Sequence, residues 1–144
     1  MVTVVVPALI LWSGGLHVSV LSAVVGGLLV LLGLVLVVWT VRLFVTEGRG
    51  TLAPWDATTR LVVRGPYRHV RNPMITGVAT ILAGEAVLFQ SWGIAILFAV
   101  FVVVNAIYFP LVEEPGLSRR FGPEYDEYRS HVPRWVPRLR AWQA

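Results

Sequence analysis

Long apolar runs almost free of charge leave this chain few ways to fold. From Met1 to Val41 the only ionisable side chain is His17, and the clearest run extends from about Ser19 to Val45. Such a run exceeds the roughly 20 residues that cross the hydrocarbon core of a bilayer. Only 14% of the residues are charged, compared with roughly 25% in soluble domains. The sequence therefore predicts an all-α, polytopic transmembrane bundle, and the lack of a positive n-region favours retained helices over a signal peptide.

Two further apolar runs follow in the second half of the chain. They extend from Pro73 to about Phe89 and from Trp92 to about Val112, with only Gln90-Ser91 between them. So short a polar break predicts a tight antiparallel helical hairpin. The segment Val2–Trp12 is expected to form a short N-terminal helix, and its crossing of the membrane is left open. The prediction is three full spans plus this short helix, four in total.

The basic residues indicate how the helices are oriented. All of them are arginines, and nearly all lie in two polar blocks beside the apolar runs. By the positive-inside rule both blocks are cytoplasmic, and clustering of this kind does not indicate a nucleic-acid partner. We therefore expect one multi-pass integral-membrane domain over 1–144, with N-terminal helices (1–46), a cytoplasmic loop (47–72), a helical hairpin (73–112) and a cytoplasmic tail (113–144). The blocks are Arg49, Arg60, Arg64, Arg68 and Arg71, then Arg119, Arg120, Arg129, Arg134, Arg138 and Arg140.

The first polar block ends in Arg71-Asn72-Pro73-Met74, which has the pattern of a helix start. Asn72 can accept a hydrogen bond from an orphan backbone N–H at the N-cap, and Pro73 suits the first helical position. A helix end of this kind carries a partial positive charge and can hold a carboxylate or another anionic group. The alternative is that the basic residues here only orient the membrane helix.

The tail opens with Glu113-Glu114 at the end of the last span. Successive helical side chains point about 100° apart, so one carboxylate can bind a ligand while the other pairs with an arginine. A C-terminal amphipathic helix follows, with a stop and restart at Gly122-Pro123. Its apolar face, at helical spacing, favours a helix that lies on lipid. The face consists of Leu117, Phe121, Tyr125 and Tyr128.

Several short motifs occur in a fixed order over about residues 47–138. They are Gly65-Pro66-Tyr67, Arg71-Asn72-Pro73-Met74, a helical hairpin, Glu113-Glu114, Phe121-Gly122-Pro123-Glu124-Tyr125, Tyr128 and Val132-Pro133-Arg134. In combination they resemble the isoprenylcysteine carboxyl methyltransferase-like membrane proteins and, more distantly, the phospholipid N-methyltransferases. The resemblance implies an integral-membrane methyltransferase that binds S-adenosylmethionine at the cytoplasmic side of the hairpin.

The resemblance also implies which residues bind the cofactor. Glu113 would be its main acidic contact, with Glu114 adjacent. The other implied contacts are Thr59, Arg60, Leu61, Val62, Tyr67, Asn72, Pro73, Met74 and Ile75. No catalytic acid or base is assigned, because a carboxylate or thiolate acceptor is already a nucleophile, and positioning with water exclusion can carry much of the rate. The chain has no cysteine, which excludes thiolate metal sites, and no metal is expected.

Three positions depart from the pattern of the protein carboxyl methyltransferases. Asn72 stands where those proteins typically have histidine, and Ile75 where they have an aromatic residue. Phe109 replaces an arginine that can meet a substrate carboxylate, and it is therefore the substrate-side candidate. The loss of that cation weakens the case for a prenylated-cysteine acceptor and leaves oxygen, nitrogen and sulfur acceptors open.

Two functions from different classes follow from these observations. The first is a methyltransferase that acts on a lipophilic small molecule or a lipid. The second is a non-catalytic membrane module whose cationic loop and tail bind anionic lipid or a partner protein. A transporter is disfavoured because the spans carry few polar groups, and the oligomeric state is left open.

Overall fold

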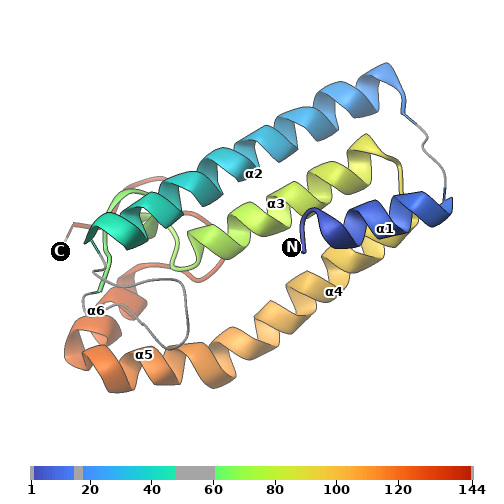
Figure 1. The fold of residues 1–144 in the computed structure, drawn as a ribbon. Coiled ribbons are helices and arrows are strands. Elements are labelled where there is room, and N and C mark those ends of the chain that lie inside the picture. The colour runs from blue at the N-terminus through green and yellow to red at the C-terminus, as the bar shows by residue number, and fades with distance from the viewer. Residues whose placement is uncertain (1, 15–17, 48–60, 144) are drawn as a thin grey trace. The chain divides into compact units, whose positions relative to one another are not determined.

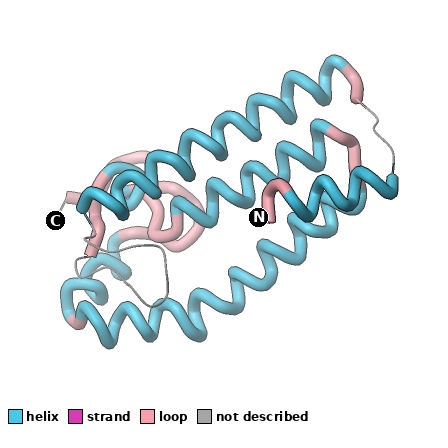
Figure 2. The backbone as a smooth tube through the Cα atoms, in the orientation of Figure 1, coloured by secondary structure: helices cyan, strands magenta, loops and turns pink. Residues whose placement is uncertain are grey.

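The computed structural model describes residues 2–14, 18–47 and 61–143 (Figure 1). Within these ranges the chain is helical without any strand, so the predicted all-α class is confirmed (Figure 2). The elements are α1 (Val5–Gly14), α2 (Val20–Glu47), a 3₁₀ turn (Gly65–Arg68), α3 (Pro73–Leu88), α4 (Trp92–Tyr108), a π-helical segment (Phe109–Glu113), α5 (Glu114–Phe121) and α6 (Pro123–His131).

Two helices are long and apolar enough to cross a membrane. They are α2, with 28 residues, and the continuous stretch Trp92–Phe121, with 30 residues, which joins α4, the π-helical segment and α5. Only 17% and 6% of their most apolar windows are buried, unlike the core helices of a soluble protein. α3 has 16 residues, about 24 Å at the rise of an α-helix, which is less than the roughly 30 Å hydrocarbon core. The described residues therefore contain two candidate spans, and the predicted total of four is not confirmed.

The chain divides into two compact units. Unit 1 contains Met1–Val35 and Ile75–Ala106, and unit 2 contains Leu36–Met74 and Ile107–Ala144. The single domain expected over 1–144 stays a prediction. The predicted hairpin lies where the sequence placed it, since α3 ends at Leu88 and α4 begins at Trp92. Between them Gln90 has a φ of 48°, a left-handed conformation that occurs mostly in turns.

In unit 1, α2 and α3 approach each other through glycines. A methyl group added to Gly26 would lie 2.7 Å from the carbonyl oxygen of Gly84, and one added to Gly33 would lie 2.6 Å from that of Gly77. Gly27 has no such neighbour within 4 Å. Gly26 and Gly33 therefore admit the neighbouring helix, because only a residue without a Cβ allows backbones to come this close.

Gly33→Ala is expected to lower the unfolding temperature of the detergent-purified protein, whereas Gly27→Ala is expected to leave it unchanged or slightly raised. The first change places a Cβ against backbone atoms of α3, and overpacking of this kind costs about 1–3 kcal/mol. The second adds helix propensity of up to about 1 kcal/mol at an open position. Circular dichroism during heating measures both. Equal effects of the two changes would show that the close approach at Gly33 does not contribute to stability.

Unit 2 contains a small core around α6. Tyr125, Tyr128 and Val132 are buried there, and Leu117 and Phe121 of α5 pack against them. The helix breaks at Gly122, whose φ of 58° and ψ of −136° suit glycine and few other residues. The predicted stop and restart at Gly122-Pro123 is thus confirmed. The apolar face itself packs against protein, so the expectation that it lies on lipid was wrong. The loop residues Leu61 and Val63, together with Trp142, complete this core.

Candidate functional site

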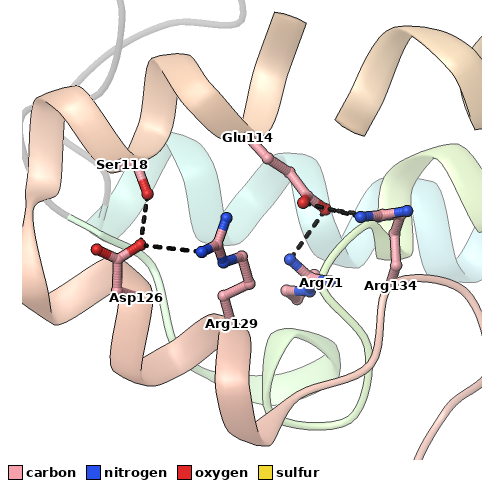
Figure 3. A network of polar contacts seen from close by, with 6 residues as sticks. All are labelled: Arg71, Glu114, Ser118, Asp126, Arg129 and Arg134. Atoms are coloured by element: carbon pink, nitrogen blue, oxygen red, sulfur yellow. Dashed lines mark hydrogen bonds and ion pairs between the residues drawn. The ribbon is translucent and has the colours of Figure 1, made fainter. Parts of the chain in front are cut away.

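The carboxylate of Glu114 is the centre of a polar network in unit 2 (Figure 3). Arg134 donates from Nε to Oε1 at 2.6 Å and from Nη2 to Oε2 at 2.9 Å. Nη1 of Arg71 lies 2.9 Å from Oε1. The three residues come from separate segments, since Arg71 precedes α3, Glu114 begins α5 and Arg134 follows α6. The network therefore joins the loop, the end of the last span and the tail.

The network is buried, which distinguishes it from an ion pair on the surface. Glu114 is 5% exposed, and the side chain of Arg71 is 9% exposed. Two guanidinium groups share one carboxylate, so the network carries a formal surplus of one positive charge. Nη1 of Arg71 is engaged by Glu114, whereas its Nε is buried and donates no hydrogen bond within the described part of the chain. Since buried donors normally have acceptors, Arg71 is suited to receive an anionic group.

The tail holds this arrangement in place through backbone hydrogen bonds. The amide of Arg71 donates to the carbonyl oxygen of Pro133 at 2.9 Å. Arg68 and Trp142 exchange two bonds, with Nε of Arg68 donating to the Trp142 carbonyl oxygen at 2.6 Å and the Trp142 amide donating back at 3.0 Å. The tail is therefore hydrogen-bonded to the residues that directly precede α3. The hydrogen bond to Glu114 also raises the pKa of Arg134, although burial opposes this shift.

The segment before Glu114 has an irregular helical geometry. Phe109–Glu113 forms a π-helical turn with a proline near its start, and such turns occur frequently at functional sites. The ring of Phe109 meets that of Trp135 edge-on, with centroids 5.6 Å apart. Glu113 is half-buried, and its carboxylate makes no hydrogen bond or ion pair with the residues that the structure describes. The two neighbouring glutamates thus differ, because Glu114 is paired and Glu113 is available.

The residues that the resemblance assigns to the cofactor are placed as follows. Tyr67 is buried, and its carbonyl oxygen accepts a hydrogen bond from the hydroxyl of Tyr128 at 2.7 Å. Val62 and Pro73 are buried, whereas Asn72 and Met74 are half-buried. These residues belong to unit 2 with both glutamates, and Ile75 belongs to unit 1. Thr59 and Arg60 lie outside the described residues. Asn72 and Pro73 directly follow Arg71, which forms an ion pair with Glu114. This ion pair therefore joins the Arg71-Asn72-Pro73-Met74 motif to the Glu113-Glu114 motif.

Leu61 lines a pocket of about 240 Å³ in unit 2. This volume is below the roughly 300–1,000 Å³ of typical ligand pockets. The pocket is therefore too small to enclose a nucleotide cofactor by itself. Its other lining residues are Glu47, Val63, Arg64, Glu124, Glu127 and Trp142.

Reasoning from sequence missed two residues of this network, Arg71 and Arg134. Both occur in the motifs that carry the resemblance, yet neither was predicted to contact the cofactor. The available signal was the pair of adjacent glutamates at the end of an apolar helix, because a carboxylate buried there needs a cation. Each segment contains several arginines, however, and the sequence does not say which of them reaches Glu114.

The hydroxyl of Tyr128 leads to a prediction about alkaline pH. Burial raises the pKa of Tyr128, and the neighbouring Tyr67 adds to the shift. The stability linked to this shift is fully present below the ordinary tyrosine pKa of about 10, and it is lost as the pH rises through the higher pKa of the folded state. We expect Tyr128→Phe to cost about 1 kcal/mol at neutral pH and to reduce the loss of stability above about pH 10.

Thermal unfolding in detergent at neutral and alkaline pH measures this effect. Tyr108→Phe is the control for the loss of a tyrosine hydroxyl, because Tyr108 is an exposed residue of α4, and it should leave the stability at neutral pH unchanged. If wild-type protein and Tyr128→Phe lose stability in parallel above about pH 10, ionisation of Tyr128 is not the cause.

Comparisons with known proteins indicate the family of the chain. The model of the phospholipid methyltransferase family matches residues 21–124, which is more than half of the chain. The nickel-cobalt-cadmium resistance protein NccN of Alcaligenes xylosoxydans xylosoxydans is 33% identical over 85 residues, which make up 57% of this chain and 38% of that protein. The chain thus matches well under half the length of this relative. No solved structure matches the chain. With its two membrane-length helices, the chain belongs to the phospholipid methyltransferase family.

Proposed function

We propose that the protein is an integral-membrane methyltransferase of the isoprenylcysteine carboxyl methyltransferase-like type, which transfers a methyl group from S-adenosylmethionine to a lipophilic acceptor. The observation that carries the proposal is the ion pair between Arg71 and Glu114. It joins the Arg71-Asn72-Pro73-Met74 stretch to the glutamate pair, and these are the two parts of the motif set that the resemblance assigns to the cofactor. Membership of a methyltransferase family supports the same reaction class.

The residues present fit the chemistry of S-adenosylmethionine. This cofactor has a carboxylate, an ammonium group, a sulfonium centre and ribose hydroxyls. Arg71 offers a buried Nε without a hydrogen-bond partner among the described residues, and this donor suits the carboxylate. Glu113 offers a carboxylate that can accept from the ammonium group or the hydroxyls. When bound, the cofactor supplies an electrophilic methyl group, and the residues of this chain orient the reactants and exclude water.

The acceptor side differs from that of an enzyme that methylates carboxylates. The side chain at position 109 is a phenylalanine, and its ring packs against Trp135. No cation at this position can therefore neutralise an acceptor carboxylate. The exposed apolar side chains of α2, including Val20, Leu21 and Leu28, suit contact with lipid. We propose that the acceptor is a membrane-soluble molecule and that the polar loop and the tail lie on the cytoplasmic side.

Methyl transfer can be tested directly on purified protein. The full chain in mixed micelles is incubated with S-adenosylmethionine labelled on the methyl group and with a total lipid extract of the expression host. Radioactivity in the organic phase that disappears on adding S-adenosylhomocysteine is the expected result. The absence both of organic-soluble product and of calorimetric S-adenosylhomocysteine binding would rule the proposal out.

A second candidate function is a non-catalytic module that binds anionic lipid. The observation that favours it is the pair Arg119 and Arg120, which are exposed in the last turn of α5. Cationic side chains near a bilayer attract anionic lipid by about 1 kcal/mol each. Retention of anionic lipid that depends on these two arginines, without any methyl transfer, would favour this function over the enzyme.

A further inference from the structure

We propose that Arg134 is a positioning residue for the methyl transfer, although it lies in the tail outside the residues assigned to the cofactor. The proposal rests on the proposed function. Arg134 is not a catalytic residue in this view. It fixes Glu114 and thereby sets the positions of Arg71 and Glu113, which would touch the cofactor.

Three consecutive tail residues, Pro133-Arg134-Trp135, form what we call the tail clamp. The carbonyl oxygen of Pro133 accepts from the amide of Arg71 at 2.9 Å. Arg134 holds both carboxylate oxygens of Glu114. The ring of Trp135 meets that of Phe109 at an interplanar angle of 78°. The clamp therefore holds the residue before Asn72-Pro73, the first residue of the π-helical segment that contains Glu113, and the residue directly after that segment.

Arg134 and Arg71 contact Glu114 in different ways, and this difference explains why Arg134 would affect cofactor binding. Arg134 occupies both oxygens in the parallel geometry that a guanidinium and a carboxylate prefer. Arg71 is left with one ion pair to Oε1 and keeps Nε without a partner among the described residues. Without Arg134, the buried carboxylate has only Arg71 to satisfy it. Arg71 would then turn toward Glu114, and its free Nε would no longer be available to an anionic group.

The same reasoning distinguishes arginine from lysine at this position. Lysine keeps the charge, but it is a point donor and does not hold both oxygens of a carboxylate in one plane. Arg134→Lys should therefore retain most of the charge balance that stabilises unit 2. It should nevertheless allow Glu114, and with it Glu113 and Arg71, to take other orientations. Small misplacements of reacting or binding groups reduce rates by up to about 100-fold.

The test compares Arg134→Lys with Arg129→Lys in the full chain purified in detergent. Arg129 is a matched control, because it is an exposed tail arginine paired with Asp126 at 3.6 Å. Calorimetry measures the affinity for S-adenosylhomocysteine, well below the unfolding temperature of each variant. We expect Arg134→Lys to weaken binding about 10- to 100-fold and to raise the KM for S-adenosylmethionine. Arg129→Lys should bind like the wild type.

A merely structural Arg134 would lower the unfolding temperature and leave the affinity of the folded protein unchanged, and this result would overturn the proposal. In that case the wild type would still bind S-adenosylhomocysteine, and the proposed function would stand. If the wild-type protein itself does not bind, both proposals fail. Arg134→Met, which removes the charge as well, should reduce affinity further, and an affinity equal to that of the wild type would again contradict the positioning role.

Discussion

Glu114→Ala is expected to lower the free energy of unfolding by about 3–5 kcal/mol. The change removes the only acid of the buried network and leaves the guanidinium groups of Arg71 and Arg134 facing each other without an anion. Arg71 is the more costly of the two, because its side chain is 9% exposed whereas that of Arg134 is 31% exposed. Thermal and denaturant unfolding in detergent, followed by circular dichroism, measure the loss.

Asp126→Ala is the matched control for this prediction. Asp126 also accepts from a side chain, Ser118, and pairs with an arginine, Arg129, but the pair lies at 3.6 Å on the surface (Figure 3). Exposed ion pairs contribute about 0–1 kcal/mol, so this change should have little effect. If Glu114→Ala is no more destabilising than Asp126→Ala, the network does not hold unit 2 together.

A triple change separates the stability of the network from its role in binding. Replacing Arg71, Glu114 and Arg134 together by methionine removes the charges without leaving any of them unpaired. Such apolar replacements of buried ion networks are often neutral or stabilising by about 1–4 kcal/mol. The triple variant should therefore recover much of the stability lost in Glu114→Ala. It should still fail to bind S-adenosylhomocysteine, because the cation offered by Arg71 is gone.

The helix boundaries could be predicted because they depend on nearby residues. Pro73 starts α3, Gln90-Ser91 ends the run before α4, and Gly122-Pro123 separates α5 from α6. Each of these breaks is a local property of backbone geometry. The number of spans was harder to predict, because α3 is also an apolar helix but has only 16 residues, and whether it crosses depends on bilayer thickness.

The difference between Glu113 and Glu114 could not be predicted from local pattern. Adjacent helical residues point in different directions, which indicated that only one glutamate would pair with arginine. Which of the two glutamates pairs with arginine depends on the π-helical turn at Phe109–Glu113. The extra residue in that turn changes the direction in which the side chains after it point. The partner Arg134 is 20 residues away in sequence, and only the folded tail brings it to Glu114.

Glu113→Ala is expected to weaken S-adenosylhomocysteine binding about 10- to 100-fold, because hydrogen bonds to charged groups contribute about 1.5–3 kcal/mol and each 1.4 kcal/mol is a factor of ten. The same change should leave the unfolding temperature close to that of the wild type. The carboxylate of Glu113 is half-buried and forms no ion pair with the described residues, so its removal leaves no charge without a partner. Calorimetry and thermal unfolding on the same preparation measure both quantities.

The two neighbouring glutamates should therefore respond in opposite ways. Glu114→Ala should reduce stability strongly, and Glu113→Ala should reduce cofactor affinity in a protein that remains folded. Glu113→Gln provides the control for size, since it keeps the shape and an acceptor oxygen but loses the charge that would attract an ammonium group. An affinity for Glu113→Gln between those of the wild type and Glu113→Ala supports a direct contact with the cofactor. Should Glu113→Ala bind S-adenosylhomocysteine as the wild type does, the carboxylate that contacts the cofactor lies elsewhere, because Glu114 is already occupied by two arginines.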